Sequence, residues 1–521
     1  MSADPQREVQ DFLSDPATHG GTPVERIDTH AAMVFLAGER AFKVKRQVRF
    51  SFLDFSSLEL RRAALESELS LNRRTAPEIY LRVRRITRGV SGGLEWDSAG
   101  EIVEWVLEMR RFDQALRLDR LADAGKLTGA MIADLVDALI DLHARAEVLG
   151  APYGGAEDLE GIVRDNTADL GEWPELFPPS EVTSLDEDCW AAWRALAPLL
   201  DRRRARGWVR HGHGDLHLAN VVLWKGRPTP FDCIEFNPEL RWIDTISEAA
   251  FVAMDLQARG YPGYGWRFIN RYLEDSVDYE AIRLLRYYVI YRALVRAKVE
   301  ALQVDAAQKP SAQAFSTAFA YLNLADSWAT RRRVGIIIMH GLSGSGKSTV
   351  ATQLVEALGA IRLRSDVVRK QLFNLRPDAD SGSATDQGIY SAESTEKTYR
   401  RLQQLTEMIT AAHFCVIVDA TFLDEARRRQ FLQLQTGLRC ARIIVNCEAP
   451  EATLRKRILE RKNDPSEANL DVLERQIRTR QAISAEEREM AGVVNVGPDS
   501  LSAAQVDEIE KLLAIGQQAY P

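Results

Sequence analysis

The sequence predicts a chain of two domains: a mixed α+β domain over residues 1–330, followed by an α/β domain over residues 331–521. Three observations support this fold class. The chain has 521 residues, more than a single domain usually holds. After residue 330, strand and helix patterns alternate regularly, which favours a largely parallel sheet covered on both faces. Before residue 330, short alternating strands lead into a long region of helical spacing.

The first domain begins with strand patterns and continues with helices. Three strands and one helix are expected in its first part, at 33–36, 41–45, 101–109 and about 57–74. From about 128 to 330 the apolar spacing is mostly helical, interrupted by a strand-rich stretch at 208–235. Three arginines at 331–333 then precede a new apolar strand. We therefore place the domain boundary at about residue 330.

The second domain contains five expected strands separated by helices. These strands are expected near 334–340, 361–364, 414–420, 441–447 and 493–497. The runs IIIM, CVIVDA and RIIVNC are almost wholly apolar, as is typical of strands buried on both faces of a parallel sheet.

Composition limits the classes of partner. Hydrophobic residues make up 45% and charged residues 27% of the chain, as in ordinary globular proteins. The net charge is −8; from residue 333 onward 25 Lys/Arg balance 25 Asp/Glu, and the first 332 residues carry 42 against 50. Neither part has the basic surplus of a nucleic-acid-binding domain, so small-molecule substrates are favoured over nucleic acid.

The sequence also indicates the compartment. The five cysteines lie far apart and form no C-x-x-C pair, as is typical of a reducing cytoplasm. The first residues, MSADPQREVQDFL, lack the basic and apolar segments of a signal peptide. No apolar stretch approaches the roughly 20 residues needed to cross a bilayer. We expect a cytoplasmic protein without a membrane segment, and nothing here indicates its oligomeric state.

A glycine-rich loop stands between the strand expected at 334–340 and the following helix. Its sequence GLSGSGKS fits G-x-x-x-x-G-K-[ST], in which backbone N–H groups point at phosphate oxygens and the helix N-terminus adds positive potential. Lys347 is expected to reach the β- and γ-phosphates and Ser348 to bind Mg²⁺. The loop predicts binding of ATP, with GTP as the alternative. The residues expected to contact the nucleotide are Gly341, Ser343, Gly344, Ser345, Gly346, Lys347, Ser348 and Thr349.

An aspartate ends the apolar strand in VIVDATF. Asp419 therefore lies at the carboxyl edge of a parallel strand beside the P-loop, where the magnesium site of such domains lies. We expect Asp419 to be a metal ligand. A role as the N-terminal cap of the next helix is the alternative.

The second strand of this domain is followed by Ser365 and Asp366, with Arg369 one helical turn further on. Together with the P-loop, the segments SDVVR, VIVDATF and LRKRILERKNDPSEA resemble the P-loop small-molecule and polynucleotide kinases over about 334–500. That group includes gluconate-kinase-like, zeta-toxin-like and 5′-hydroxyl polynucleotide kinases. The resemblance implies that Asp366 is the general base and Arg369 a substrate clamp. A helix-capping Asp with a surface Arg is the alternative.

A basic helix precedes the segment NDPS. In the kinases that this domain resembles, the corresponding stretch is a lid whose arginines neutralise the transferring phosphoryl group. Arg457 and Arg461 are four residues apart and share one helix face, so both are candidates for that role, with Arg455 beside them. Solvated surface charge is the alternative, and the sequence does not decide which arginine acts.

A second constellation lies in the first domain, in HGDLHLAN at 213–220 and the later Asp232. It compares with the protein-kinase pattern H-R-D-x-x-x-x-N followed by a metal-binding Asp. In phosphoryl transfer one carboxylate orients the attacking hydroxyl and takes its proton, while an amide oxygen and a second carboxylate hold Mg²⁺. The spacing from Asp215 to Asn220 suits that chemistry.

The segment HGDLHLAN resembles the catalytic loop of the aminoglycoside phosphotransferases, which have a protein-kinase-like bilobal fold. The resemblance covers roughly 25–300 and implies that Asp215 is the base and that Asn220 and Asp232 are metal ligands. It also implies that His213 and His217 shape the loop.

The same resemblance predicts a lysine in the N-terminal lobe paired with a helix glutamate. Ala41-Phe42-Lys43 fits the A-x-K strand pattern, so Lys43 is preferred, and Lys45 on the same strand face is the alternative. Glu68 is the preferred partner, ahead of Glu66. Adenine would meet the backbone near Met109.

One departure concerns the phosphate-covering loop. No G-x-G-x-x-G precedes Lys43, and the hairpin before it offers only Gly38. This departure keeps open the possibility that the first domain binds ATP poorly.

Three functional hypotheses follow. The preferred one is a bifunctional ATP-dependent kinase that phosphorylates hydroxyl groups of small molecules, such as sugars, amino sugars or nucleosides, at two sites. The second makes the C-terminal domain a 5′-hydroxyl polynucleotide or RNA-end kinase. The third makes one domain a degenerate nucleotide-sensing module that regulates the other.

Overall fold

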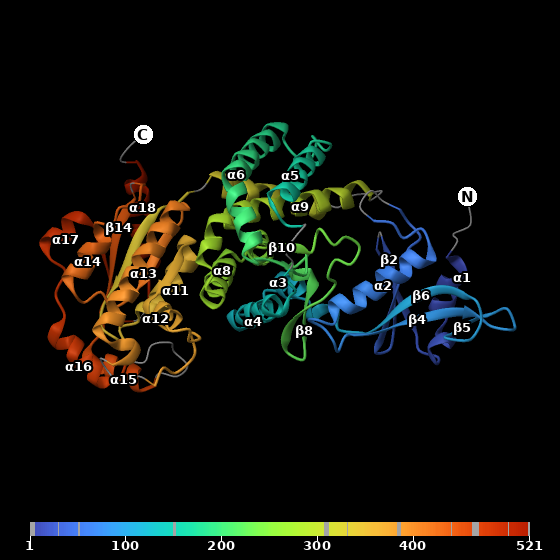
Figure 1. Ribbon diagram of the computed structural model, residues 1–521, viewed down its shortest axis with the longest axis horizontal. Helices are drawn as coiled ribbons and strands as arrows, with labels where there is room; N and C mark the ends of the chain where they lie inside the picture. The colour runs from blue at the N-terminus through green and yellow to red at the C-terminus, as the bar shows by residue number, and fades with distance from the viewer. Residues whose placement is uncertain are drawn as a thin grey trace. The chain divides into compact units, whose positions relative to one another are not determined.

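The computed structural model describes residues 6–29, 31–49, 53–148, 153–306, 312–330, 332–382, 387–438, 440–460, 468–498 and 500–518. By the contacts between Cα atoms, the chain forms two compact units (Figure 1). Unit 1 comprises Met1–Asp165 and Ala191–Asp255, and unit 2 comprises Asn166–Trp190 and Leu256–Pro521.

Unit 1 contains an antiparallel sheet. Within the described residues it has six strands in the order β1-β2-β3-β6-β4-β5. Their bounds are Val24–Asp28, Ala32–Ala37, Arg40–Lys45, Tyr80–Arg88, Leu94–Trp96 and Ile102–Arg110 for β1 to β6. The strands expected at 33–36, 41–45 and 101–109 are therefore confirmed as β2, β3 and β6.

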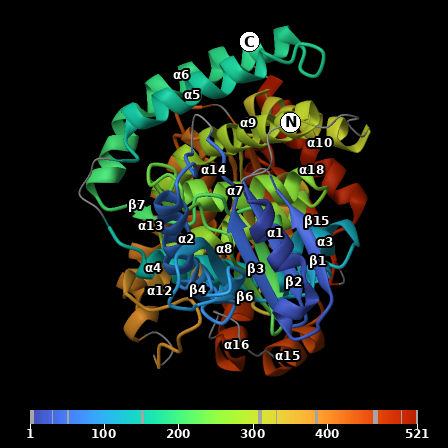
Figure 2. The same cartoon turned by 90° about the vertical axis from the view of Figure 1, so that its right-hand side faces the viewer.

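One helix packs on each face of this sheet. Helix α1 (Arg7–Ser14) packs through Val9 and Leu13 against a cluster that includes Phe42 and Val44, and Figure 2 shows it lying across β2 and β3. Helix α2 (Leu58–Asn72), expected at about 57–74, packs on the other face. Successive side chains along a strand point to opposite faces of the sheet. Phe42 and Val44 therefore lie on one face and Lys43 and Lys45 on the other. The alternation of β3 therefore aims both lysines at α2.

The rest of unit 1, as far as it is described, is mostly helical, with two antiparallel strand pairs, β7 with β10 and β8 with β9. Its helices and strands are α3 (Leu118–Asp123), α4 (Gly129–Arg145), α7 (Thr245–Ala258), β7 (Val209–His211), β8 (Val221–Trp224), β9 (Arg227–Pro230) and β10 (Trp242–Asp244). Along the sequence, the division between the units falls within α5 (Ala156–Leu170), within α6 (Pro179–Ala205) and near the end of α7. The β8–β9 turn uses Lys225 and Gly226, both with positive φ, as tight hairpins require. The strand-rich stretch expected at 208–235 is confirmed.

Unit 2 contains the parallel sheet. Within the described residues its five strands have the order β12-β13-β11-β14-β15, and every pair is parallel. Their bounds are Gly335–His340, Ile361–Arg364, Cys415–Asp419, Ala441–Cys447 and Gly492–Val496 for β11 to β15. All five expected strands are confirmed, and the three central ones, β13, β11 and β14, are mostly apolar runs buried on both faces.

Helices cover both faces of the parallel sheet (Figure 1). On one face, α11 (Lys347–Leu358) and α18 (Ala503–Gln518) pack on alternate strand residues such as Ile337 and Val445. On the other, α13 (Ala392–Ala411) and α14 (Glu425–Leu432) contact β11 and β13. The remaining helices of this part are α12 (Ser365–Leu372), α15 (Glu451–Glu460), α16 (Leu470–Thr479) and α17 (Ala485–Met490). None of the helices described has the length and apolar character needed to cross a bilayer.

Three helices before residue 331 belong to the same compact unit as the parallel sheet. They are α8 (Pro262–Ser276), α9 (Ile282–Ala306) and α10 (Ala312–Thr330). Helix α8 borders the sheet at β12: Asn270 Nδ2 donates to Ala360 O at 3.0 Å, and Asn270 Oδ1 accepts from Arg362 N at 2.6 Å. Trp266 packs over Gly359, where a Cβ atom would lie 2.8 Å from the indole ring. A fragment that begins at 331 would lack both side chains, so the domain boundary near 330 stays a prediction.

Asn270 provides a direct test of this packing. Replacing Asn270, only 3% exposed, with Ala leaves the buried Ala360 O and Arg362 N without these partners. Each lost partner costs about 1–3 kcal/mol, so the free energy of unfolding of unit 2 is expected to fall by about 2–5 kcal/mol in urea titrations. Arg271→Ala, on an exposed i,i+4 pair of the same helix, is the control and should change it by less than about 1 kcal/mol. Equal stability of the two variants would contradict this role of α8.

Candidate active sites

The P-loop connects β11 to α11 and has the backbone that its glycines predict. Gly341, Gly344 and Gly346 have φ values of 140°, 83° and 98°, a region that side chains disfavour. A Cβ atom at Gly341 would lie 2.3 Å from Cys447 O, and one at Gly344 would lie 2.9 Å from Leu454 O. Packing of the loop against the chain after β14 therefore requires glycine at both positions.

The lysine of the P-loop lies against the loop itself. Lys347 Nζ donates to Leu342 O at 2.8 Å, and the residue is buried at the start of α11. Ser343 N donates to Gln476 Oε1 of α16 at 2.9 Å, which ties the loop to the segment after the basic helix. The residue types and the loop fit a phosphate-binding site, and the contacts predicted for Ser343 to Thr349 stay predictions.

Asp419 ends β13 beside Arg364 of β12, its partner in register. Its side chain is buried, with 6% of the residue exposed, and Oδ2 has no hydrogen-bond partner within the described part of the chain. A buried carboxylate oxygen without a partner is costly unless a cation or water binds it. Asp419 therefore fits the magnesium ligand that the sequence predicts, together with Ser348.

Asp366 and Arg369 lie on α12, which follows β12 at the carboxyl edge of the sheet. Asp366 is in the first turn of the helix. Arg369 Nη1 donates to Ile389 O and to Thr395 Oγ1, both at 3.0 Å, and its guanidinium lies 5.1 Å from the centre of the Tyr390 ring. These contacts connect Arg369 to the first turn of α13 and to the segment before it. The predicted roles of Asp366 as base and Arg369 as substrate clamp stay predictions.

The arginines of the basic helix α15 differ in their contacts. Arg457 donates to Gly344 O at 3.4 Å and to Pro498 O at 2.6 Å, so it contacts the P-loop. Arg455 instead pairs with Glu451 and Glu474 on the surface. Of the two arginines described in this helix, Arg457 is therefore the one that lies next to the P-loop, where a bound nucleotide is expected. Arg461, predicted to share its face, lies outside the described residues.

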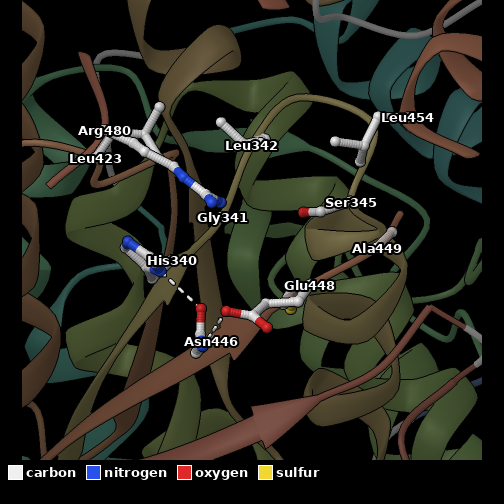
Figure 3. A pocket seen from close by; sticks show the side chains of 11 residues that line it. His340, Gly341, Leu342, Ser345, Leu423, Asn446, Glu448, Ala449, Leu454 and Arg480 are labelled. Carbon is white, nitrogen blue, oxygen red and sulfur yellow. Dashed lines mark hydrogen bonds between the residues drawn. The ribbon is translucent and has the colours of Figure 1, made fainter. Parts of the chain in front are cut away.

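A cavity of about 210 Å³ lies beside the P-loop (Figure 3). Polar side chains that line it include His340, Asn446, Glu448 and Arg480. Figure 3 shows the Arg480 guanidinium close to Gly341 and the hydrogen bonds that join His340, Asn446 and Glu448. The sequence interpretation missed these residues. The sequence did contain a signal for two of them: His340 and Asn446 are polar residues at or near the ends of two apolar strands. A buried polar side chain in such a place needs a hydrogen-bond partner, either a neighbouring residue or a ligand.

In unit 1 the predicted lysine and glutamate form an ion pair. Lys43 Nζ lies 2.7 Å from Glu68 Oε1 and 2.8 Å from Asp232 Oδ1. Burial favours the neutral amine, but the charges of Asp232 and Glu68 outweigh it and raise the pKa of Lys43 well above its usual value. Lys43 is therefore a fixed cation between the helix glutamate and the predicted metal ligand. Glu66 pairs with Arg62 on the surface, which favours Glu68 as the partner.

Lys45, the alternative lysine, also reaches Glu68. Its Nζ lies 2.7 Å from Glu68 Oε2 and 2.5 Å from Glu235 Oε1. Glu68 is fully buried, so two lysines neutralise one carboxylate inside the unit. Only Lys43 also contacts Asp232 among the contacts described, which favours Lys43 as the phosphate-binding lysine. The pairing of Lys45 with Glu235 was not predicted from the sequence.

The loop HGDLHLAN brings Asp215 and Asn220 together. Asn220 Nδ2 donates to Asp215 O at 2.9 Å and to Asp215 Oδ2 at 3.0 Å. This leaves the amide oxygen of Asn220 as the atom suited to a metal. His217 Nε2 lies 3.4 Å from Asp215 Oδ2, and Leu218 N donates to the buried Asp255. Asp232 has a φ of 60°, and its N–H donates to Tyr80 Oη at 3.1 Å, which sets the carboxylate toward Lys43.

A buried glutamate that sequence reasoning missed holds the start of this loop. Glu248 Oε1 accepts from His213 N at 2.5 Å and from Gly214 N at 2.7 Å, and Glu248 Oε2 accepts from His143 Nε2 at 2.8 Å. Burial opposes its ionisation, but the His143 hydrogen bond and charge and the loop N–H groups outweigh burial and lower the pKa of Glu248 to about 2. His213 Nε2 bonds to Phe231 O, which supports its expected role in shaping the loop.

This carboxylate predicts a pH dependence of stability. The folded-state pKa of Glu248, about 2, lies below its ordinary value of 4.5, so the unfolded chain binds the proton more tightly. The stabilisation, about 3 kcal/mol, is fully present above pH 4.5 and is lost as the pH falls toward 2. In urea titrations Glu248→Gln is therefore expected to be less stable than the wild type at pH 7, with a difference that shrinks below pH 4.5. A difference that stays constant with pH would contradict this.

Met109, expected near adenine, lies near the end of β6 and pairs in register with Ala41 and Tyr80. Gly38 lies in the β2–β3 turn with a φ of 57°. The strand and the turn are in the predicted places, and the contact of Met109 with adenine stays a prediction.

Comparison with known proteins finds a family model for part of unit 2 and resemblances to solved structures. Residues 336–483 match the family model of the AAA domain. Among solved structures, a choline/ethanolamine kinase family protein from Mesorhizobium loti is 14% identical, with 63% of this chain and 95% of that chain covered and a TM-score of 0.41. A gluconokinase from Sinorhizobium meliloti 1021 is 22% identical, with 36% and 96% covered and a TM-score of 0.25.

Two curated relatives match along most of their length. They are uncharacterised proteins from Mycobacterium tuberculosis and Mycobacterium bovis, each 30% identical over 455 residues. Each alignment covers 85% of this chain and 88% of the relative, and so includes residues of both units. The chain belongs to the same family as these mycobacterial proteins.

Proposed function

We propose that the protein is a bifunctional ATP-dependent phosphotransferase that transfers the γ-phosphate of ATP to hydroxyl groups of small molecules at two separate sites. For unit 1, the proposal rests on the contact of Lys43 with both Glu68 and Asp232. The hydrogen bond between Asn220 and Asp215 in the same unit supports it. The P-loop with Lys347 and the buried Asp419 supports it for unit 2. We further propose that the protein acts in the cytoplasm.

In unit 1, Asp215 takes the proton of the substrate hydroxyl as that oxygen attacks the γ-phosphorus. Asn220 Nδ2, bonded to Asp215 Oδ2, holds the carboxylate in place. Lys43 binds phosphate oxygens, and Glu68 fixes the position of its amine. Asn220 and Asp232 would hold Mg²⁺, which would neutralise part of the negative charge of the triphosphate.

In unit 2, the N–H groups of the P-loop and Lys347 bind the phosphates. Ser348 and Asp419 would hold Mg²⁺ in the same role. Asp366 takes the hydroxyl proton, and Arg457, which contacts the loop at Gly344, stabilises negative charge on the phosphoryl group.

The test is transfer of labelled γ-phosphate from ATP by the full chain. The acceptor panel contains sugars, amino sugars, nucleosides, aminoglycosides and a 5′-hydroxyl oligonucleotide, and it is run with the wild type, Asp215→Asn and Lys347→Ala. We expect two groups of small-molecule acceptors, each lost in one variant. If one substitution abolishes all transfer and the other abolishes none, one unit is regulatory. If the oligonucleotide is the acceptor that Lys347→Ala loses, unit 2 is a polynucleotide kinase.

A further inference from the structure

The lining of the cavity beside the P-loop combines Gly341, Leu342 and Ser345 of the loop with residues that are not expected to contact the nucleotide. The cavity lies next to β11 and β14, and the described residues that line it do not include Lys347, Ser348 or Asp419. His340 and Asn446 end these two strands as partners in register. The site therefore has its own polar wall, made by strand ends and not by the nucleotide-binding lysine.

Hydrogen bonds fix the tautomer of His340. Asn446 Nδ2 donates to Glu448 Oε1 at 3.1 Å and to Asn495 Oδ1 at 2.9 Å, which uses both of its hydrogens. Asn446 Oδ1 must then accept from His340 Nδ1, at 2.7 Å. Burial lowers the pKa of His340, although the Asn446 hydrogen bond opposes the shift. The ring is therefore neutral, with the proton on Nδ1 and a lone pair on Nε2.

Two buried polar atoms at this cavity have no hydrogen-bond partner within the described part of the chain: His340 Nε2 and Ser345 Oγ. The two residues are only 8% and 2% exposed. A buried polar atom without a partner destabilises the fold, so a ligand that completes these bonds gains binding energy. At Nε2 the ligand must donate a hydrogen, and at Ser345 it can donate or accept.

The other walls are one cation and an apolar surface. The cation is Arg480, which follows α16 directly and whose backbone N–H donates to Gln476 O at 3.0 Å. The apolar part of the lining is formed by Leu342, Leu423, Ala449 and Leu454. The volume, about 210 Å³, lies below the roughly 300–1,000 Å³ of sites for drug-sized ligands.

We propose that this cavity binds a small polyhydroxylated molecule, of the size and class of a monosaccharide or cyclic polyol. One hydroxyl donates to His340 Nε2, others accept from Arg480 and pair with Ser345 and Glu448, and the carbon face lies on the leucine wall. Hydroxyl groups suit this lining because each can both donate and accept. The inference concerns binding and stands apart from phosphoryl transfer, so it is tested without ATP.

The experiment is saturation-transfer NMR of the full chain with D-glucose, D-ribose, myo-inositol and glycerol, each at up to about 10 mM, above the usual range of KM values. At least one is expected to bind. His340→Phe is expected to weaken that binding by at least about tenfold, and His340→Gln to weaken it less, because an amide oxygen can accept the same hydrogen bond. Arg480→Ala is expected to weaken it, whereas Arg478→Ala, at an exposed arginine of the preceding helix α16 that does not line the cavity, is not.

Two results would overturn the inference. One is that no polyol binds; the other is that binding is unchanged in both His340→Phe and Arg480→Ala, which would place the polyol elsewhere. Thermal unfolding of each variant controls for folding, and the exposed Arg480 keeps the test valid if His340→Phe unfolds. If no polyol binds but phosphoryl transfer to another class of acceptor is intact, only the inference about the cavity is contradicted. If a polyol binds but no phosphoryl transfer is found, the inference about the cavity holds and the proposed function of unit 2 is contradicted.

Discussion

Replacing Asp215 with Asn is expected to slow phosphoryl transfer at unit 1 by about 10²–10⁴-fold, the usual contribution of a general base. The amide has the size of the carboxylate and keeps an oxygen that can accept from Asn220 Nδ2, now 3.0 Å from Asp215 Oδ2. It cannot take a proton from the attacking hydroxyl. The rate of the chemical step should therefore fall, while nucleotide binding, which we propose to depend on Lys43 and Asp232, is retained.

The measurement is kcat for labelled transfer to an acceptor of unit 1, with nucleotide affinity measured separately. Asp134→Asn, on an exposed position of α4, is the matched control and should leave both unchanged. If the transfer rate of Asp215→Asn stays within about threefold of the wild-type rate, Asp215 is not the base. A rate contribution that small lies below the range usual for a general base. Loss of nucleotide affinity in place of kcat would assign Asp215 to binding.

Replacing Lys347 with Ala is expected to reduce transfer at unit 2 by about 10²–10³-fold and to weaken nucleotide binding there. The lysine is the cation of the P-loop, and its present hydrogen bond to Leu342 O, at 2.8 Å, holds it within the loop. Loss of this charge removes an interaction that strengthens as negative charge develops on the γ-phosphate. Transfer at unit 1 should not change, because Lys43 is the lysine that we propose to bind phosphate there.

Lys397→Ala is the matched control for this substitution. Lys397 is 59% exposed and pairs with Glu393 along α13, so its loss should leave transfer unchanged. Measuring both variants with one acceptor for each unit separates a local effect from a general loss of folding. Retention of full transfer at unit 2 by Lys347→Ala would show that the P-loop is not its phosphate-binding element.

The parallel sheet and its P-loop could be predicted from the sequence because their signals are local. Strands such as IIIM are buried on both faces, so their apolar character does not depend on a distant partner. The glycines of the loop are required by backbone conformation and close packing at Gly341 and Gly344, which a short motif records. The ion pair of Lys43 with Glu68 followed from the strand pattern and the family resemblance.

The features that the sequence did not reveal depend on contacts between distant segments. Glu248 holds the start of the HGDLHLAN loop through backbone N–H groups, and a helix glutamate looks the same in sequence whether it is buried or solvated. The pairing of Lys45 with Glu235 joins residues 190 positions apart. Asn270 caps the edge of the parallel sheet from a helix that the sequence places in the first domain. Only the fold brings these partners together.

The central claim is that one polypeptide holds two independent nucleotide sites. Isothermal titration of the full chain with Mg²⁺ and a non-hydrolysable ATP analogue tests it most directly. The account predicts two molecules of analogue bound per chain in the wild type and one in Lys347→Ala, with the remaining site unchanged in affinity. A single site in the wild type, or complete loss of binding in a folded Lys347→Ala, would contradict it.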